Sequence, residues 1–247
     1  MKSGSVFLTA EWRSLAMLNY EVDPRLLRPL VPAGTELDHW HGRTFVSLVG
    51  FMFLNTRVFG LPIPFHRNFE EVNLRFYVRR REGSELRRGV VFVREIVPRW
   101  AIATVARKFY GEKYVSVPMS HQIRARADGG SAVEYAWRVA DKWNKLSLTA
   151  IGEPALPAED SEEQFITEHY WGYAAQPGSG SLEYRVAHPS WRIWRVHESR
   201  FQGNMEELYG RELAAIIKSK PASAFLAEGS EVAVYRGRSL PLKKAAP

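Results

Sequence analysis

The sequence predicts a mainly β protein of the α+β class, in which antiparallel strands form the body and a few helices lie at the edges. Hydrophobic and polar residues alternate with a period of two in residues 133–139, 182–186, 191–196 and 231–236. Asp128-Gly129-Gly130 is a strong turn signal between two such strands. Helix signals are few, and each marks a short segment.

The length and composition of the chain agree with a single domain over residues 1–247. Of the 247 residues, 45% are hydrophobic and 13% are aromatic, which is ample for a large core. All-β barrels of this length often form one domain. The insert at residues 176–181 has a flexible composition but is too short to separate two domains.

The first two predicted helices are marked at their ends. Asp23 is an N-cap residue followed by Pro24 at the first helical position, so a short helix is expected to run through Leu30. A longer helix is expected over residues 99–110, because Gly111 provides a natural C-terminal stop.

Two further helices are predicted from capping pairs. Ser161 and Gln164 have the spacing of a capping box ahead of an apolar stretch that reaches His169. Asn204 and Glu207 repeat the spacing and predict a shorter helical piece.

The strand expected over residues 69–78 is the most informative segment. One face would carry four apolar side chains, which are those of Val72, Leu74, Phe76 and Val78. The other face would carry four polar-tipped side chains, about 7 Å apart, which are those of Glu71, Asn73, Arg75 and Tyr77. A carboxylate, an amide, a guanidinium and a phenol in one row predict the wall of a polar cavity. The alternative is a solvated face of a two-layer sheet.

The next strand, over residues 89–93, is expected to be buried on both faces.

The composition excludes several kinds of chemistry and location. The chain has no cysteine, so it has no disulfide, no thiolate nucleophile and no cysteine–zinc site. It has no run of eighteen apolar residues, and residues 1–5 lack the hydrophobic stretch of a secretory signal. A soluble, cytoplasmic protein with no membrane partner is therefore expected.

The net charge of +7 raises the question of a nucleic-acid partner. The positive charge concentrates in Lys243-Lys244 and around a turn, where the residues are Arg79, Arg80, Arg81, Arg87 and Arg88. No helix-turn-helix, zinc-finger or RNA-binding signature accompanies them. A solvated hairpin rim is therefore favoured over a nucleic-acid groove, and an interaction protein with a basic rim is the third-ranked function.

The histidines give no compact metal-binding pattern. His39 and His41 would share one face of a strand, but no His-Glu-x-x-His or other ligand set follows. His188 and His197 are expected to serve packing and hydrogen bonding. The chain also lacks a Gly-x-Ser-x-Gly elbow, a P-loop and a dinucleotide fingerprint, so no metal and no cofactor are predicted.

Residues 107–114 end the predicted second helix, so their last side chains could project into a space that the strands enclose. Lys113 could act there as a nucleophile if its surroundings activated it, or it could be a solvated loop lysine. Tyr114 could instead offer a phenolic donor or weak acid within reach of Glu71.

Several motifs together resemble one known group of proteins. They are residues 27–32 (Leu-Arg-Pro-Leu-Val-Pro), the polar row of residues 69–78, Tyr110-Gly111, residues 168–171 (Glu-His-Tyr-Trp) and His188-Pro189-x-Trp191. Over roughly residues 8–236 the chain is similar to the YqjF-like uncharacterised family, a domain of unknown function in the acetoacetate decarboxylase-like superfamily.

The resemblance implies a large, cone-like antiparallel β-barrel with a central cavity and a few flanking helices. It places the arginine of the family on Arg13 and the cavity glutamate on or beside Glu71. The decarboxylases form a Schiff base through a lysine that a neighbouring cation activates. In this sequence that lysine falls on Tyr114, and Lys113 stands where the pattern has a proline. The second acidic residue of the pattern is absent from residues 43–47.

The leading hypothesis is a polar barrel cavity that binds a small anionic molecule, a carboxylate or an oxo acid, with acid/base chemistry. Glu71 is the predicted acid or base, and Tyr114 would orient a carbonyl or hydroxyl group. Arg13 and Arg75 would hold the anionic group, because guanidinium binds carboxylate in a bidentate manner. The predicted substrate-binding residues are Arg13, Asn73, Arg75 and Tyr77.

Two alternatives remain open. One is a non-catalytic ligand-binding or sensor protein that has lost the Schiff-base lysine of the superfamily. The other is a Schiff-base lyase that uses Lys113. The substrate and the oligomeric state are not predicted, a homo-oligomer being one option.

Overall fold

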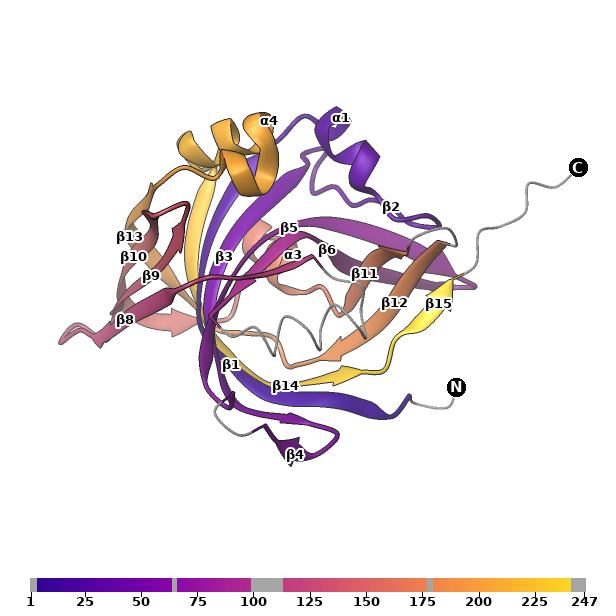
Figure 1. Cartoon of the computed structure of the whole chain (residues 1–247), viewed down its shortest axis with the longest axis horizontal. Helices are drawn as coiled ribbons and strands as arrows, with labels where there is room; N and C mark the ends of the chain where they lie inside the picture. The colour runs from indigo at the N-terminus through magenta and orange to yellow at the C-terminus, as the bar shows by residue number, and fades with distance from the viewer. Residues whose placement is uncertain (1–3, 64–65, 99–112, 177–179, 241–247) are drawn as a thin grey trace, which may run out of the picture.

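The structure is a computed structural model that describes residues 4–63, 66–98, 113–176 and 180–240. Its strands form one continuous sheet that coils into a cone-like barrel and extends into a second layer (Figure 1). The predicted mainly β fold with few helices is therefore confirmed. The strands are β1 (Val6–Glu21), β2 (Glu36–Leu37), β3 (Phe45–Val58), β4 (Leu61–Pro62), β5 (Phe69–Glu82), β6 (Glu85–Val97), β7 (Tyr114–Ser116), β8 (Met119–Ala125), β9 (Ser131–Val139), β10 (Lys142–Ala155), β11 (Trp171–Gln176), β12 (Gly180–Ala187), β13 (Ile193–Gln202), β14 (Ser223–Tyr235) and β15 (Arg238–Leu240). The helices are α1 (Pro24–Leu27), the 3-10 turn η1 (Arg28–Leu30), α3 (Glu162–Thr167) and α4 (Glu206–Lys218).

A closed circuit of strand pairings forms the barrel. The order is β1, β3, β5, β6, β11, β12, β14 and back to β1. All of these neighbours are antiparallel except β6 and β11, which run parallel. The last joint, between β12 and β14, consists of the pairs Val186–Val234 and Ala187–Ala233. The circuit places the inner faces of seven strands around one enclosed space.

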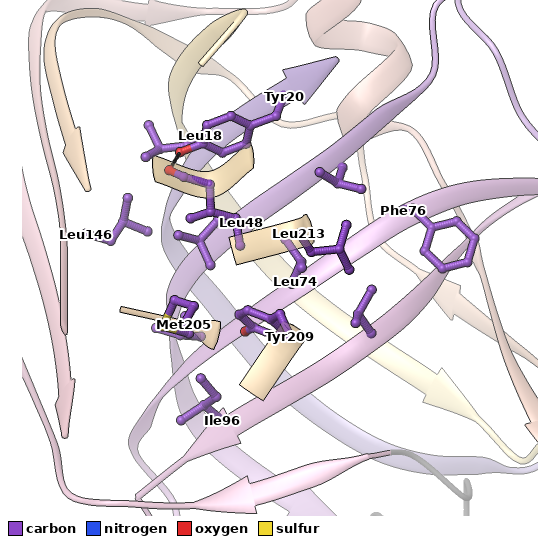
Figure 2. Close-up of a cluster of buried hydrophobic side chains, with 14 of the residues drawn as sticks. Leu18, Tyr20, Leu48, Leu74, Phe76, Ile96, Leu146, Met205, Tyr209 and Leu213 are labelled. Carbon is purple, nitrogen blue, oxygen red and sulfur yellow. Dashed lines mark hydrogen bonds between the residues drawn. The ribbon is translucent and has the colours of Figure 1, made fainter. Parts of the chain in front are cut away.

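The second layer and helix α4 cover the outside of the barrel. Strands β13, β10, β9 and β8 continue the sheet beyond β14. Figure 2 shows Leu213 of α4 beside Leu48 and Leu74 of the barrel strands, and Met205, which precedes the helix, belongs to the same cluster. Tyr20 also donates a hydrogen bond from its hydroxyl to the carbonyl of Ile217 at 2.9 Å. This outer core fixes the curvature of β1, β3 and β5 from behind.

Strand β5 divides the two cores as its alternation predicts. Val72, Leu74, Phe76 and Val78 belong to the outer core, and each is fully buried. The alternate residues face the inside of the barrel, where Tyr77 packs in a separate inner core with Phe165. Strand β6 is buried on both faces over Val90 and Val91, which join the inner and the outer core respectively. Both predictions are confirmed.

The marked helix starts and the turn agree with the sequence. The side chain of Asp23 accepts a hydrogen bond from the backbone of Arg25 at the start of α1. Ser161 caps α3 by accepting from the backbone of Gln164 at 3.1 Å. Between β8 and β9, the carboxylate of Asp128 accepts from the backbone of Gly130 at 3.0 Å and closes the predicted turn.

One predicted helix is wrong in length, and another lies outside the described residues. Helix α4 has 13 residues rather than forming a short piece, although Gly210 interrupts it with a φ of 77°. Asn204 does not occupy the cap position, which belongs to Met205, but its side chain accepts from the backbone of Glu206 at 3.1 Å. The helix expected over residues 99–110, with Gly111 as its stop, lies outside the described part of the chain.

Within the described residues, no helix has the length and apolar character that crossing a membrane requires.

Candidate functional site

The space inside the barrel is a cavity of about 120 Å³. Such a volume is several times the space that one buried water molecule needs. Its polar wall residues include Glu71, Asn73 and Arg75 of β5, Glu95 of β6, Tyr114 of β7, and His169 in the segment that follows α3. Three members of the row predicted on β5 therefore line one cavity together with Tyr114.

Glu71 is the centre of this polar group, with only 2% of its surface exposed. The amide nitrogen of Asn73 donates to Glu71 Oε1 at 2.9 Å, and the hydroxyl of Tyr114 donates to Oε2 at 3.2 Å. Burial raises the pKa of Glu71 to about 7, against the opposing effects of these hydrogen bonds and of the charge on Arg75. A carboxyl group with a pKa near neutrality can both give and take a proton.

Tyr114, rather than Lys113, faces the cavity. Strand β7 runs parallel to β6, with Tyr114 opposite Glu95. Burial, with the charges of Glu71 and Glu95, raises the pKa of Tyr114 well above its ordinary value, so the phenol stays protonated and acts as a donor. Lys113 lies one residue earlier and is exposed, and it is not part of the cavity wall. A one-residue offset in an extended chain turns a side chain to the other face.

Arg75 is a buried cation, with 7% of its surface exposed. Its guanidinium lies 3.5 Å from the carbonyl oxygen of Ile166 and 3.9 Å from the sulfur of Met17. Among the described residues, no carboxylate lies within ion-pair distance of it, and its Nε has no hydrogen-bond partner. The positive charge of Arg75 is therefore not neutralised by a direct contact with the described wall.

Tyr77 shares the inner face with Arg75 but is not part of the cavity wall. Its hydroxyl is hydrogen-bonded to Ser47 at 2.6 Å, and Ser47 donates to the side chain of Asn19 at 2.6 Å. Its ring contacts that of His169, with the centroids 4.6 Å apart. Tyr77 therefore packs behind the residues that line the cavity, whereas the sequence predicted that it would contact a substrate.

Arg13 lies outside the cavity because of a β-bulge in β1. Ser14 has a φ of 54°, and the register with β3 shifts between Arg13 and Ala16. Before the bulge Trp12 points into the cavity, and after it Leu15 does. Arg13 consequently points outward into a surface groove, where it pairs with Glu11 at 2.9 Å. The structure does not bring it near Arg75.

Glu95 and His169 are wall residues that the sequence analysis missed. Glu95 lies opposite Asn73 and is 3% exposed, but a register shift between β5 and β6 breaks the alternation that would have revealed it. His169 was noted only as part of a motif. Its Nε2 lies 3.4 Å from Asp38 Oδ2, and burial lowers its pKa to about 4, so the ring is neutral near pH 7.

The remaining histidine predictions have mixed outcomes. His39 and His41 do not share a strand face, because neither lies in a strand and His41 occupies a tight turn with a φ of 47°. His188 packs as expected, with its ring stacked on Trp191 at 4.2 Å and its Nδ1 hydrogen-bonded to Pro189. No group of three or more residues able to hold a metal occurs in the described part of the chain.

Acidic residues neutralise most of the basic cluster around the β5–β6 turn. The pairs are Arg79 with Glu36, Arg80 and Arg87 with Glu183, and Arg88 with Asp38. Because these four guanidinium groups are bound to carboxylates, they are not free to bind phosphates.

Comparison by sequence identifies relatives without a described activity. A family model described as an uncharacterized conserved protein, DUF2071, matches residues 9–231. The uncharacterized protein YqjF of Bacillus subtilis (strain 168) is 30% identical over 163 residues, which are 64% of this chain and 64% of that protein. The match therefore covers less than two thirds of the length of that relative.

Comparison by structure places the chain among acetoacetate decarboxylase-like folds. Acetoacetate decarboxylase from Legionella pneumophila has a TM-score of 0.66 at 12% identity, over 97% of this chain and 90% of that one. The enduracididine biosynthesis enzyme MppR has a TM-score of 0.67 at 14% identity, over 98% and 93% of the two chains. An acetoacetate decarboxylase-like enzyme from Sphingomonas wittichii RW1 has a TM-score of 0.63 at 14% identity, over 97% and 95%. These likenesses establish the fold.

Proposed function

The chain belongs to the DUF2071 family of uncharacterized conserved proteins, and from the cavity of this member we infer that it binds a small carboxylate or oxo acid inside the barrel. Arg75 carries the proposal. A buried cation without a counter-charge is unfavourable, and a carboxylate ligand would supply both the charge and the hydrogen-bond acceptors. Guanidinium also matches carboxylate in shape.

We propose that Glu71 is the acid or base that acts on the bound molecule. It lies four residues from Arg75 on the same strand face, with Asn73 between them, and the charge of Arg75 acts on the carboxyl group of Glu71. An anion that is held by Arg75 and extends along this face would therefore approach Glu71. Asn73 and Tyr114 fix the two oxygens of the carboxyl group. A pKa of about 7 suits proton transfer near neutral pH.

The fold relatives are compatible with this class of ligand. MppR, which shares the fold, is described as complexed with pyruvate, a small oxo acid. At 14% identity this likeness supports only the suitability of such a barrel for an oxo acid, and the assignment to this chain depends on Arg75 and Glu71.

Non-catalytic binding is the second candidate, and one observation favours it over a lyase. The phenol of Tyr114 occupies the position near Glu71, and no lysine is among the described wall residues, Lys113 being exposed. A Schiff base requires an amine that reaches the ligand. We therefore expect borohydride to trap no adduct between the protein and any oxo acid.

Calorimetric titration with pyruvate, acetoacetate and their neutral amides tests the proposal. We expect binding of the acids, and a loss of about tenfold or more in affinity in Arg75→Gln. Arg13→Gln is the matched control, because Arg13 lies outside the cavity. Equal affinity in the wild type and Arg75→Gln would contradict the proposed binding site.

Turnover followed by NMR then separates the two candidates. If Glu71 transfers a proton, Glu71→Gln retains binding and loses turnover. If the protein is a sensor, the bound acids remain chemically unchanged in the wild type as well.

A further inference from the structure

The cavity has an aromatic wall in addition to its polar group. The aromatic wall consists of Trp12, Phe51, Phe53, Phe69 and Trp191. The rings of Phe53 and Phe69 are stacked, with centroids 4.7 Å apart and an angle of 10° between their planes. Trp12 meets Phe51 and Phe53 edge to face at 5.5 and 5.7 Å. These contacts make a fixed apolar surface on one side of the space.

Strand register places the aromatic wall beyond Glu71 and away from Arg75. Phe51 lies opposite Glu71, and Phe53 lies opposite Phe69. Phe69 precedes Arg75 by six residues on β5, which is about 20 Å along an extended strand. The cavity therefore has a cationic end at Arg75 and an aromatic end that begins at Phe51, opposite Glu71, and continues to Phe53.

The rings of the aromatic wall border open space and do not only fill the barrel. Phe53 of β3 faces the inside of the barrel, and 7% of its surface remains exposed. Phe76 of β5 faces the outer core instead, and none of its surface is exposed. A molecule as small as pyruvate, held at Arg75, would leave these rings facing water. Burial of apolar surface against them would be favourable.

We propose that the ligand is an amphipathic carboxylic acid, whose carboxylate is held by Arg75 and whose aryl or alkyl body packs on the aromatic wall. This inference rests on the proposed binding of a carboxylate and names the class of acid. Edge-to-face and stacked contacts with Trp12, Phe53 and Phe69 favour a flat aryl group over a branched alkyl group.

Three probes test the proposal by calorimetry on the full chain. Phenylpyruvate has both parts, pyruvate lacks the apolar body, and phenylethanol lacks the carboxylate. We expect phenylpyruvate to bind about tenfold or more tightly than either of the others, which corresponds to about 1.4 kcal/mol.

Variants of the aromatic wall supply the second arm. Phe51→Leu is expected to weaken phenylpyruvate binding about fivefold and to leave pyruvate binding unchanged, because Phe51 lies opposite Glu71 and is the ring of the β3 wall nearer to Arg75. Phe76→Leu is the matched control, since it removes the same ring from the outer core, and it should change neither affinity. Trp12→Phe, which keeps an aromatic ring and changes the contact with Phe51, is a second cavity variant should Phe51→Leu fold poorly by circular dichroism.

The outcomes distinguish this inference from the proposed function. Equal affinity for pyruvate and phenylpyruvate, with both still dependent on Arg75, would overturn the amphipathic ligand alone. Phenylethanol binding as tightly as phenylpyruvate, with no effect of Arg75→Gln, would overturn the proposed function together with this inference.

Discussion

At the scale of single residues, the pKa of Glu71 is set by opposing effects on one carboxyl group. Its burial favours the protonated form, while the hydrogen bonds from Asn73 and Tyr114 and the charge of Arg75 favour the carboxylate. Burial dominates and raises the pKa of Glu71 from 4.5 to about 7. Between these values the folded state holds a proton that the unfolded state has lost, so stability falls as the pH rises through this window.

Replacement of Glu71 by Gln should remove this pH dependence. Relative to the wild type, Glu71→Gln is expected to gain about 3 kcal/mol in free energy of unfolding between pH 4.5 and pH 7.5. Urea unfolding at a series of pH values measures the difference. Any constant effect of the altered hydrogen bonds cancels in the comparison across pH.

Glu231→Gln controls for the removal of one carboxylate, because Glu231 is exposed on β14. A stability difference between Glu71→Gln and the wild type that stays flat across the same pH range would rule out a raised pKa for Glu71.

The residues of the site were partly predictable. Glu71, Asn73 and Arg75 could be assigned to one face because strand alternation is a local property. The position of Tyr114 beside Glu71 depends on a strand pairing, and the sequence only indicated that the two could meet. Arg13 was misplaced because its orientation depends on the bulge at Ser14, which no turn signal marks.

At the scale of elements, the bulge in β1 decides which side chains enter the cavity. It works together with Gly229 on β14, which lies opposite Arg13 and has a φ of 81°. A Cβ atom at Gly229 would lie 2.0 Å from the carbonyl oxygen of Trp12, so only glycine fits there. The hydroxyl of Tyr135 also donates to the carbonyl of Ser14 at 2.9 Å.

Gly229→Ala should therefore destabilise the protein well beyond the cost of its backbone conformation. We expect a loss of at least about 2 kcal/mol in free energy of unfolding, measured by urea denaturation, because the clash involves backbone and cannot be relieved by a rotamer change. Gly42→Ala is the matched control, with a φ of 79° and open space around the site. It should cost about 1 kcal/mol. Equal losses in the two variants would count against the close approach at the bulge.

Elements were predictable where their signals are local. The capped helices and the turn at Asp128 follow from side chains that bond to nearby backbone. Helix α4 proved longer than predicted, because its packing on the outer core rather than a capping side chain stabilises it.

At the scale of the whole molecule, the barrel depends on joints between segments distant in sequence. The β11–β12 hairpin is joined to β6 by two residue pairs and to β14 by two more, far fewer than β1 shares with its neighbours. Glu183 reinforces this hairpin. Its carboxylate accepts from Arg80 of β5 at 3.0 Å, from Arg87 of β6 at 2.8 Å and from Arg238 of β15 at 2.7 Å. Neither the short joints nor this network could be predicted, because both depend on long-range register.

Glu183→Gln should weaken the whole molecule, because it leaves the buried Arg87 with less opposing charge. We expect a loss of about 3 kcal/mol in free energy of unfolding. Glu85→Gln is the control, because Glu85 also binds Arg87 but its side chain is 44% exposed. It should cost less than about 1 kcal/mol. Similar effects of the two substitutions would show that Glu183 has no special role.

The β11–β12 hairpin, held to β6 and to β14 by two residue pairs each, also affects how a molecule enters and leaves the barrel. Trp171 and Tyr184 of this hairpin line the cavity, and the hairpin has less backbone pairing to lose than its neighbours when it separates from the barrel. Its amide protons should exchange with solvent sooner than those of β3 or β5. A carboxylate outside the cavity, that of Glu183, would then govern the exchange of the occupant, and its replacement should raise the association and dissociation rates together with little change in affinity.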